Sequence, residues 1–181
     1  MKSYTRGRIE ADDTLVLAIA GDLPTALTAI AEGAGLLDLW EAGQETVAAI
    51  RDRHPGAATC APADWAGLVR DRATAQRTGA ILVCAGLAEA VAAEASGIGR
   101  DRLLVEAAPA QVTGLLSAGW RVVVSTREEA GPNATAAVSA MACWLGATAV
   151  RTGYVTAARR AIDMTTAIKG AASRQGNAPA P

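Results

Sequence analysis

The feature that most constrains the fold is a repeated cycle of a short apolar run followed by an alanine-rich amphipathic segment. The run 15–20 is apolar throughout and bounded by polar or glycine residues, which is typical of a strand buried on both faces of a parallel sheet. Asp22 and Pro24 follow it, and both favour the first turn of a helix. Gly33 ends that segment, so the first cycle reads as strand, helix and glycine stop.

The cycle returns at intervals of roughly 20 residues, which is the period of successive βα units. Further strands are expected at 35–40, 57–60, 80–84, 103–105, 122–124 and 147–150. About seven units are visible, whereas a closed (β/α)₈ barrel needs eight. The pattern predicts an α/β protein with a parallel sheet. Either a shortened or irregular TIM-like barrel or an open doubly wound sheet satisfies it, and we favour the barrel.

The third helix is expected to begin at an N-cap, Asp64, and to end at Gly79. Its inward side would carry Trp65, Leu68, Val69 and Arg72. The chain of 181 residues suits one domain, which we place at 1–170. Residues 171–181 are small, polar and proline-containing, and we expect a disordered tail there.

Charge and hydropathy exclude several classes of partner. The net charge is −1, so no electrostatic field favours nucleic acid. Most basic residues stand beside acids, as in 51–53 and 70–72, and are interpreted as solvated faces. No apolar run has the length of a membrane span and none resembles a leader, so a cytoplasmic protein without membrane contact is expected.

The sequence offers no metal site and no cofactor fingerprint. Cys60, Cys84 and Cys143 are isolated from one another, and His54 is the sole histidine. That histidine follows a helix, far from a strand end, which excludes a histidine-based triad. Neither a dinucleotide-binding glycine pattern nor a phosphate loop is present. We therefore expect no cofactor, and composition alone assigns no catalytic residue.

Polar residues do follow several of the apolar runs, and in a barrel the carboxyl ends of the strands meet at one mouth. The candidates at that mouth are Asp38, Glu106, Ser125, Thr126, Arg127 and Arg151. Asp22 also follows a strand but reads as a helix cap. Arg151 has two interpretations, a side chain aimed into the mouth or a structural salt bridge to Glu106.

The last two units resemble the end of the dihydropteroate synthases, the pterin-binding (β/α)₈ barrels of folate synthesis. That family has a strand ending in Ser-Arg-Lys and an alanine-rich helix. A Gly-Ala pair, a strand ending in Arg-x-His-Asp and a closing helix with Met-x-x-Ala-Ile follow. The similar stretches here, in chain order, are 34–38, 97–106, 122–128, 146–155 and 164–168. The likeness therefore keeps its order over most of the chain.

The resemblance implies a ligand-binding role for residues that match the family's motifs. Asp38, Glu106, Arg127 and Arg151 stand at positions equivalent to the family's pterin- and anion-binding groups, with Ser125 at the same rim. The ligand implied is a pterin or a phosphate-containing small molecule.

The same resemblance implies that several of the family's binding groups are missing from this chain. The family's lysine falls on Glu128, its histidine falls on Gly153, and the loop at 20–24 lacks the family's asparagine. Such losses remove donors that stabilise charge in the transition state. They imply a synthase-like protein with impaired or absent transferase activity. An active transferase and a non-catalytic scaffold remain as alternatives, and the alanine-rich face of 155–168 suits a homodimer by the same analogy.

Overall fold

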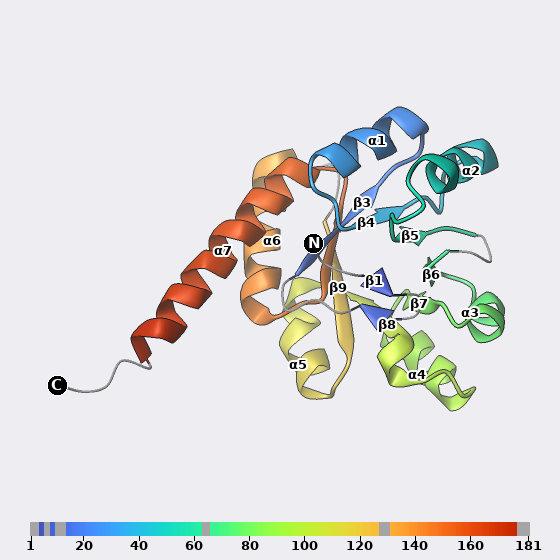
Figure 1. Ribbon diagram of the computed structural model, residues 1–181. Helices are drawn as coiled ribbons and strands as arrows, with labels where there is room; N and C mark the ends of the chain where they lie inside the picture. The colour runs from blue at the N-terminus through green and yellow to red at the C-terminus, as the bar shows by residue number, and fades with distance from the viewer. Residues whose placement is uncertain (1–3, 6–7, 10–13, 63–65, 127–130, 177–181) are drawn as a thin grey trace.

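A computed structural model describes residues 4–5, 8–9, 14–62, 66–126 and 131–176. Eight parallel strands form a closed barrel in the order β10-β3-β4-β5-β6-β7-β8-β9, and the helices lie around it (Figure 1). A two-stranded antiparallel hairpin, β1 (Tyr4–Thr5) and β2 (Arg8–Ile9), precedes the barrel. The predicted TIM-like α/β class is confirmed.

The barrel strands are short and run in chain order around the ring. They are β3 (Leu15–Ile19), β4 (Leu36–Asp38), β5 (Thr59–Cys60), β6 (Leu68–Val69), β7 (Ile81–Cys84), β8 (Leu103–Ala107), β9 (Arg121–Ser125) and β10 (Ala149–Thr152). The last strand closes the ring by pairing with the first, with Ala149 in register with Leu15. Closure leaves no unpaired strand edge in the barrel.

The helices lie along the outside, and all but the last of them connect one barrel strand to the next. They are α1 (Leu23–Ala31), α2 (Gln44–Arg53), α3 (Arg72–Thr78), α4 (Leu87–Ala95), α5 (Val112–Ser117), α6 (Gly131–Leu145) and α7 (Val155–Gly176), with short 3₁₀ turns at Arg100–Arg102 and Pro109–Gln111. Asp22 caps α1 as predicted, since its Oδ1 accepts from the amide of Thr25 at 2.8 Å.

Two cores follow from the period-two alternation of the strands. One lies inside the barrel and contains Leu17, Leu36, Leu68, Leu104 and Val123. The other lies between the strands and the helices, where small alanine side chains allow the helices to approach the sheet closely. Because the interior is filled by apolar side chains below the mouth, the barrel is a packed core, and the polar groups described below lie at its carboxyl end.

One prediction about the fold is wrong, and it explains the miscounted units. Leu68 and Val69 were expected on the inner side of a long helix, but they form strand β6. The helix that follows is shorter and is capped by Asp71, whose Oδ2 accepts from the amide of Thr74 at 2.7 Å. The expected cap, Asp64, and Trp65 lie outside the described residues. A two-residue strand is too short to show a period, so the pattern counted seven units where eight strands exist.

At the other end of the chain, α7 continues to Gly176, six residues beyond the domain boundary expected at 170. The last turns of this helix therefore replace the first part of the expected disordered tail. The remainder of that expected tail, residues 177–181, lies outside the described residues.

Candidate functional site

Four charged side chains form one layer at the carboxyl end of the barrel. They are Asp38 at the end of β4, Arg70 after β6, Glu106 on β8 and Arg151 on β10, and we call them the charged layer. These are alternate strands of the ring, the arrangement by which each layer of a TIM barrel is built. The sign of charge also alternates around the ring, from acid to base to acid to base.

The strands place these groups by simple alternation. Side chains two residues apart on a strand share a face. Leu68 lies in the barrel interior, and Arg70 follows it by two residues. Leu104 and Glu106 have the same relation on β8. A buried apolar side chain thus precedes each charged one, so the barrel interior changes from apolar to ionic at its mouth.

Asp38 is the centre of the contacts in this layer. Its side chain is 1% exposed, and its Oδ2 accepts from Arg151 Nε at 2.6 Å and from Arg70 Nη2 at 3.3 Å. Its Oδ1 accepts from the backbone amide of Trp40 at 3.1 Å. Both carboxylate oxygens are therefore used, as a buried charge requires.

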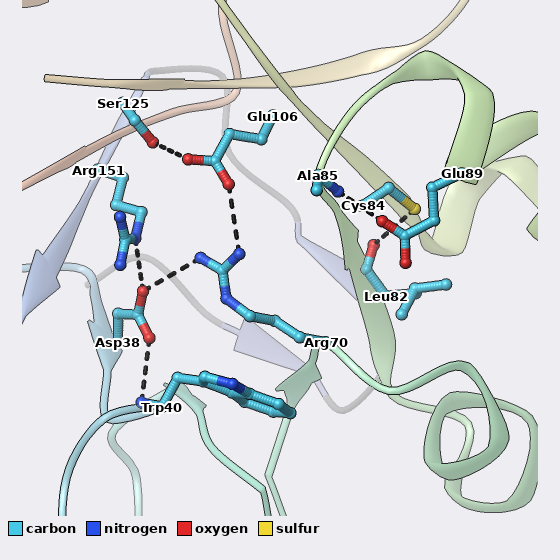
Figure 2. A network of polar contacts seen from close by, with 10 residues as sticks. All are labelled: Asp38, Trp40, Arg70, Leu82, Cys84, Ala85, Glu89, Glu106, Ser125 and Arg151. Carbon is cyan, nitrogen blue, oxygen red and sulfur yellow. Dashed lines mark hydrogen bonds and ion pairs between the residues drawn. The ribbon is translucent and has the colours of Figure 1, made fainter.

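Arg70 extends the network across the barrel (Figure 2). Its Nη1 donates to Glu106 Oε2 at 3.3 Å, while the hydroxyl of Ser125 donates to Glu106 Oε1. A continuous chain of contacts therefore runs from Arg151 through Asp38, Arg70 and Glu106 to Ser125. The two cations and two carboxylates balance within it.

Burial and neighbouring charges shift the pKa values of two groups, Arg70 and Cys60. Burial lowers the pKa of Arg70, but Asp38, Cys60 and Glu106 oppose it, and the net direction is upward. The guanidinium thus stays charged. Cys60 lies inside the barrel below the layer, where burial first and the negative charge of Asp38 second raise the pKa of its thiol to about 12. That thiol is protonated at neutral pH and is no nucleophile there.

The structure brings together four of the five predicted ligand-binding residues: Asp38, Glu106, Ser125 and Arg151 all belong to the network. Arg151 does form a salt bridge, but with Asp38 instead of the Glu106 considered from the sequence. Thr126 supports it, since the Thr126 amide donates to the Arg151 carbonyl at 2.9 Å. The fifth predicted residue, Arg127, lies outside the described residues.

Two other positions considered from the sequence, Asp22 and Gly153, take no part in the network. Asp22 is an exposed helix cap, and Gly153 is exposed beyond β10. Glu128 lies outside the described residues.

Arg70 is the functional residue that the sequence interpretation missed. It belongs to the mixed-charge stretch 70–72, which was assigned to a solvated face, yet its side chain is 20% exposed and carries two ion pairs. The sequence around Arg70 does contain a pattern that could have identified it. The apolar pair Leu68-Val69 followed by an arginine has the same form as Val150-Arg151 at the end of β10.

A cavity of about 720 Å³ adjoins one side of the charged layer. Its lining includes Glu106 and Ser125, together with Gly86, Gln111 and Trp120. Asp38, Arg70 and Arg151 are not part of that lining. The cavity therefore adjoins the layer on the side of β8 and β9, through Glu106 and Ser125.

Within the described ranges, no group of three or more His, Cys, Asp and Glu residues is placed to hold a metal ion. Among the helices that the structure describes, none combines the length and apolarity that crossing a bilayer requires. What the mouth does provide is two carboxylates and two guanidinium groups. Carboxylates accept from N–H edges and guanidinium groups donate to anions, so the arrangement is suited to binding a small polar molecule.

A closed barrel of eight parallel strands with helices outside it defines the class: a TIM-type barrel, here with a charged layer at the carboxyl ends of its strands. Comparisons of the sequence with protein-family models and with curated proteins give no match. Comparison of the structure gives the fold of the dihydropteroate synthases.

Three solved structures illustrate the likeness. Rv1207 of Mycobacterium tuberculosis matches with a TM-score of 0.76 and 23% identity, over 93% of this chain and 97% of that one. The dihydropteroate synthase of Coxiella burnetii, in complex with pteroic acid, matches with 0.73 and 15%, over 90% and 96%. That of Xanthomonas albilineans, in complex with 7,8-dihydropteroate, matches with 0.72 and 17%, over 90% and 96%. At these identities the likeness establishes the shared fold.

Proposed function

We propose that this chain is a dihydropteroate synthase-like protein that binds a pterin-type small molecule at the barrel mouth and has impaired or no transferase activity. The observation that carries the proposal is the charged layer, in which both arginines are neutralised by carboxylates of the same chain. Two fold neighbours are solved with pteroic acid and 7,8-dihydropteroate, which supports a pterin-type ligand.

Impaired transfer is expected on electrostatic grounds. Displacing a phosphate-type leaving group requires cationic groups that are free to stabilise the developing charge. Here Arg151 donates its Nε to Asp38 at 2.6 Å, and Arg70 divides its donors between two acids. Each of these two arginines is therefore engaged before any ligand arrives. Gly153 stands where the family has a histidine, and the loss of that donor should further reduce transferase activity.

Isothermal titration with pteroic acid tests the binding part of the proposal. The wild type should give saturable heat, and Arg151→Ala should abolish it because the substitution removes a cation at the mouth together with its 2.6 Å ion pair to Asp38. Arg51→Ala is the matched control, since Arg51 is half exposed and pairs with Asp52 away from the barrel mouth. No saturable heat at millimolar ligand, or equal binding by all three proteins, would contradict the proposal.

A transferase assay tests the second part. Purified protein is supplied with a dihydropterin pyrophosphate and p-aminobenzoate, and product is measured. Loss of one transition-state donor typically costs about 10²–10³ in kcat, so product formation should be at least that far below an ordinary synthase rate. Turnover at about 1–10 s⁻¹, within the usual enzyme range, would establish an active transferase instead.

A specific observation favours self-association as a second role. The outer faces of α6 and α7 lie side by side and expose large apolar side chains at Met141, Trp144, Met164 and Ile168. A groove of about 400 Å³ between the two helices is lined mainly by alanines. Small side chains allow close helix approach, and an apolar patch of this kind is typical of an interaction surface.

We propose a homodimer through this face, with a second copy of the chain as the occupant. Sedimentation equilibrium of the wild type should give twice the monomer mass of 18.3 kDa. Trp144→Glu should return the protein to the monomer, whereas Val91→Glu, an exposed position on α4, should leave the dimer unchanged. A monomeric wild type at about 100 μM, well above the Kd range of stable interfaces, would contradict the proposed assembly.

A further inference from the structure

The guanidinium of Arg70 lies between two carboxylates that come from opposite sides of the barrel. Asp38 and Glu106 come from β4 and β8, which lie opposite each other in the eight-stranded ring, with three strands between them on either side. Arg70 comes from β6, midway between them, and its two terminal nitrogens donate one to each carboxylate. In Figure 2 the guanidinium lies between the two acids and faces both.

Two carboxylates placed in this way form a seat for a forked N–H donor. A guanidinium presents its paired N–H groups in one plane, and the amidine edge of a nitrogen heterocycle presents the same geometry. The chain's own side chain therefore satisfies the acceptors that an amidine-bearing ligand would use. A ligand without such an edge has no advantage at this seat.

The contacts of Arg70 are also the longer ones in the layer. Both of its ion pairs measure 3.3 Å, whereas Arg151 lies 2.6 Å from Asp38. Charge-assisted N–H···O bonds favour about 2.7–2.9 Å. Arg70 also follows a two-residue strand, the shortest kind in the barrel, so fewer ladder hydrogen bonds fix its backbone than fix Glu106 on the five-residue β8. Arg151 is thus a fixed part of the layer and Arg70 is the displaceable one.

We propose that the seat between Asp38 and Glu106 is a binding site for an amidinium or guanidinium group, and that Arg70 closes it as an internal occupant. An incoming ligand must displace this side chain. The cavity beside Glu106 provides the route of entry. The apparent Kd for the ligand equals the intrinsic Kd divided by the fraction of molecules in which Arg70 has left the seat. That the displacing ligand is of the pterin type rests on the function proposed above, whereas the seat itself rests only on these contacts.

Capture of methylguanidinium tests the seat without a pterin. Arg70→Ala keeps both acids and removes the internal occupant, so about 10 mM methylguanidinium chloride should raise its melting temperature relative to equal sodium chloride. The wild type should show no such rise. Denaturation by guanidinium needs molar concentrations and does not interfere in this range. Arg72→Ala is the matched control, because Arg72 is exposed two positions away.

Two further variants make the result decisive. Arg70→Met keeps most of the apolar stem and serves if Arg70→Ala does not fold; it should capture methylguanidinium in the same way. Adding Glu106→Gln to either variant should abolish capture, because one of the two acceptor charges is gone. A folded Arg70 variant with no response to methylguanidinium, or a response that persists after Glu106→Gln, would overturn the proposal.

Titration of pteroic acid into wild type and Arg70→Ala then separates the seat from the proposed function. Removal of the internal occupant should lower Kd at least about tenfold, a change of ~1.4 kcal/mol. Methylguanidinium capture with no pteroic acid binding by either protein retains the seat and overturns the pterin-type ligand. Equal pteroic acid affinity in the two proteins retains the ligand and overturns the role of Arg70.

Discussion

Asp38→Asn is the perturbation that tests the charged layer most directly. The substitution keeps the volume of the side chain but removes the charge that Arg70 and Arg151 share. An amide nitrogen in place of one carboxylate oxygen also faces N–H donors. Breaking a buried ion pair by removing one partner costs about 3–5 kcal/mol. Because both arginine side chains keep about a fifth of their exposure, we expect roughly 2–4 kcal/mol here.

Urea denaturation at neutral pH measures this loss as a shift of the midpoint at constant m. Asp52→Asn is the control, since Asp52 is 66% exposed in its pair with Arg51 and should cost less than about 0.5 kcal/mol. A cost for Asp38→Asn as small as the control would refute the reasoning that the layer holds desolvated charges.

A double-mutant cycle isolates the pair itself. Combining Asp38→Asn with Arg151→Met removes the cation that the first change leaves unpaired. The double variant should therefore be more stable than the sum of the single effects predicts, by about 1–3 kcal/mol. Additivity within about 0.5 kcal/mol would mean that Asp38 and Arg151 act independently.

Three further predictions address other parts of the molecule. The pKa of Cys60 is raised to about 12 from an ordinary value of 9.0, so its contribution to stability is complete below pH 9 and is lost as pH rises toward 12. Cys60→Ala should therefore flatten the decline in stability at alkaline pH. A thiol reagent at pH 8 should modify Cys60 no faster than the chain unfolds. The hydrogen bond to Thr74 lowers the pKa of Asp71 below its ordinary value of 3.8. Asp71 therefore contributes stability at pH values above 3.8, and this contribution is lost as pH falls through the lowered pKa. Asp71→Ala should reduce the loss of melting temperature at acid pH. Leu104→Ala, in the fully buried barrel interior, should cost about 2–5 kcal/mol in urea denaturation, while Val91→Ala on the exposed side of α4 should stay within about 0.5 kcal/mol.

The sequence predicted the site where strands were long enough to show their character. β8 and β9 are five-residue strands with apolar residues followed by Glu106 and Ser125, and both residues lie in the network. Arg70 follows a strand of two residues whose apolar pair fits a helix face equally well. The periodicity of local sequence could not choose between the two, and only closure of the ring assigned Leu68 and Val69 to the sheet.

The pairing within the charged layer was likewise beyond local sequence. Arg151 follows an apolar run, which predicted its place at the mouth but not its partner. Asp38 is separated from it by 113 positions in the chain, whereas the considered partner Glu106 is much nearer in sequence. Closure of the ring makes β4 and β8 equal second neighbours of β10, one beyond β3 and the other beyond β9. Arg151 pairs with Asp38, while Glu106 accepts from Arg70 and Ser125, so sequence distance does not determine the partner.

Closure of the barrel by its last strand also determines when the protein becomes complete during synthesis. β3 is made near the start of the chain, yet its edge hydrogen bonds, such as the amide of Leu15 to the carbonyl of Thr148 at 2.9 Å, wait for a strand made near the end. Until then both β3 and β9 present open edges to other chains. A chain that stops before residue 149 therefore leaves β3 and β9 with unpaired edges, and such edges are prone to pair with other chains.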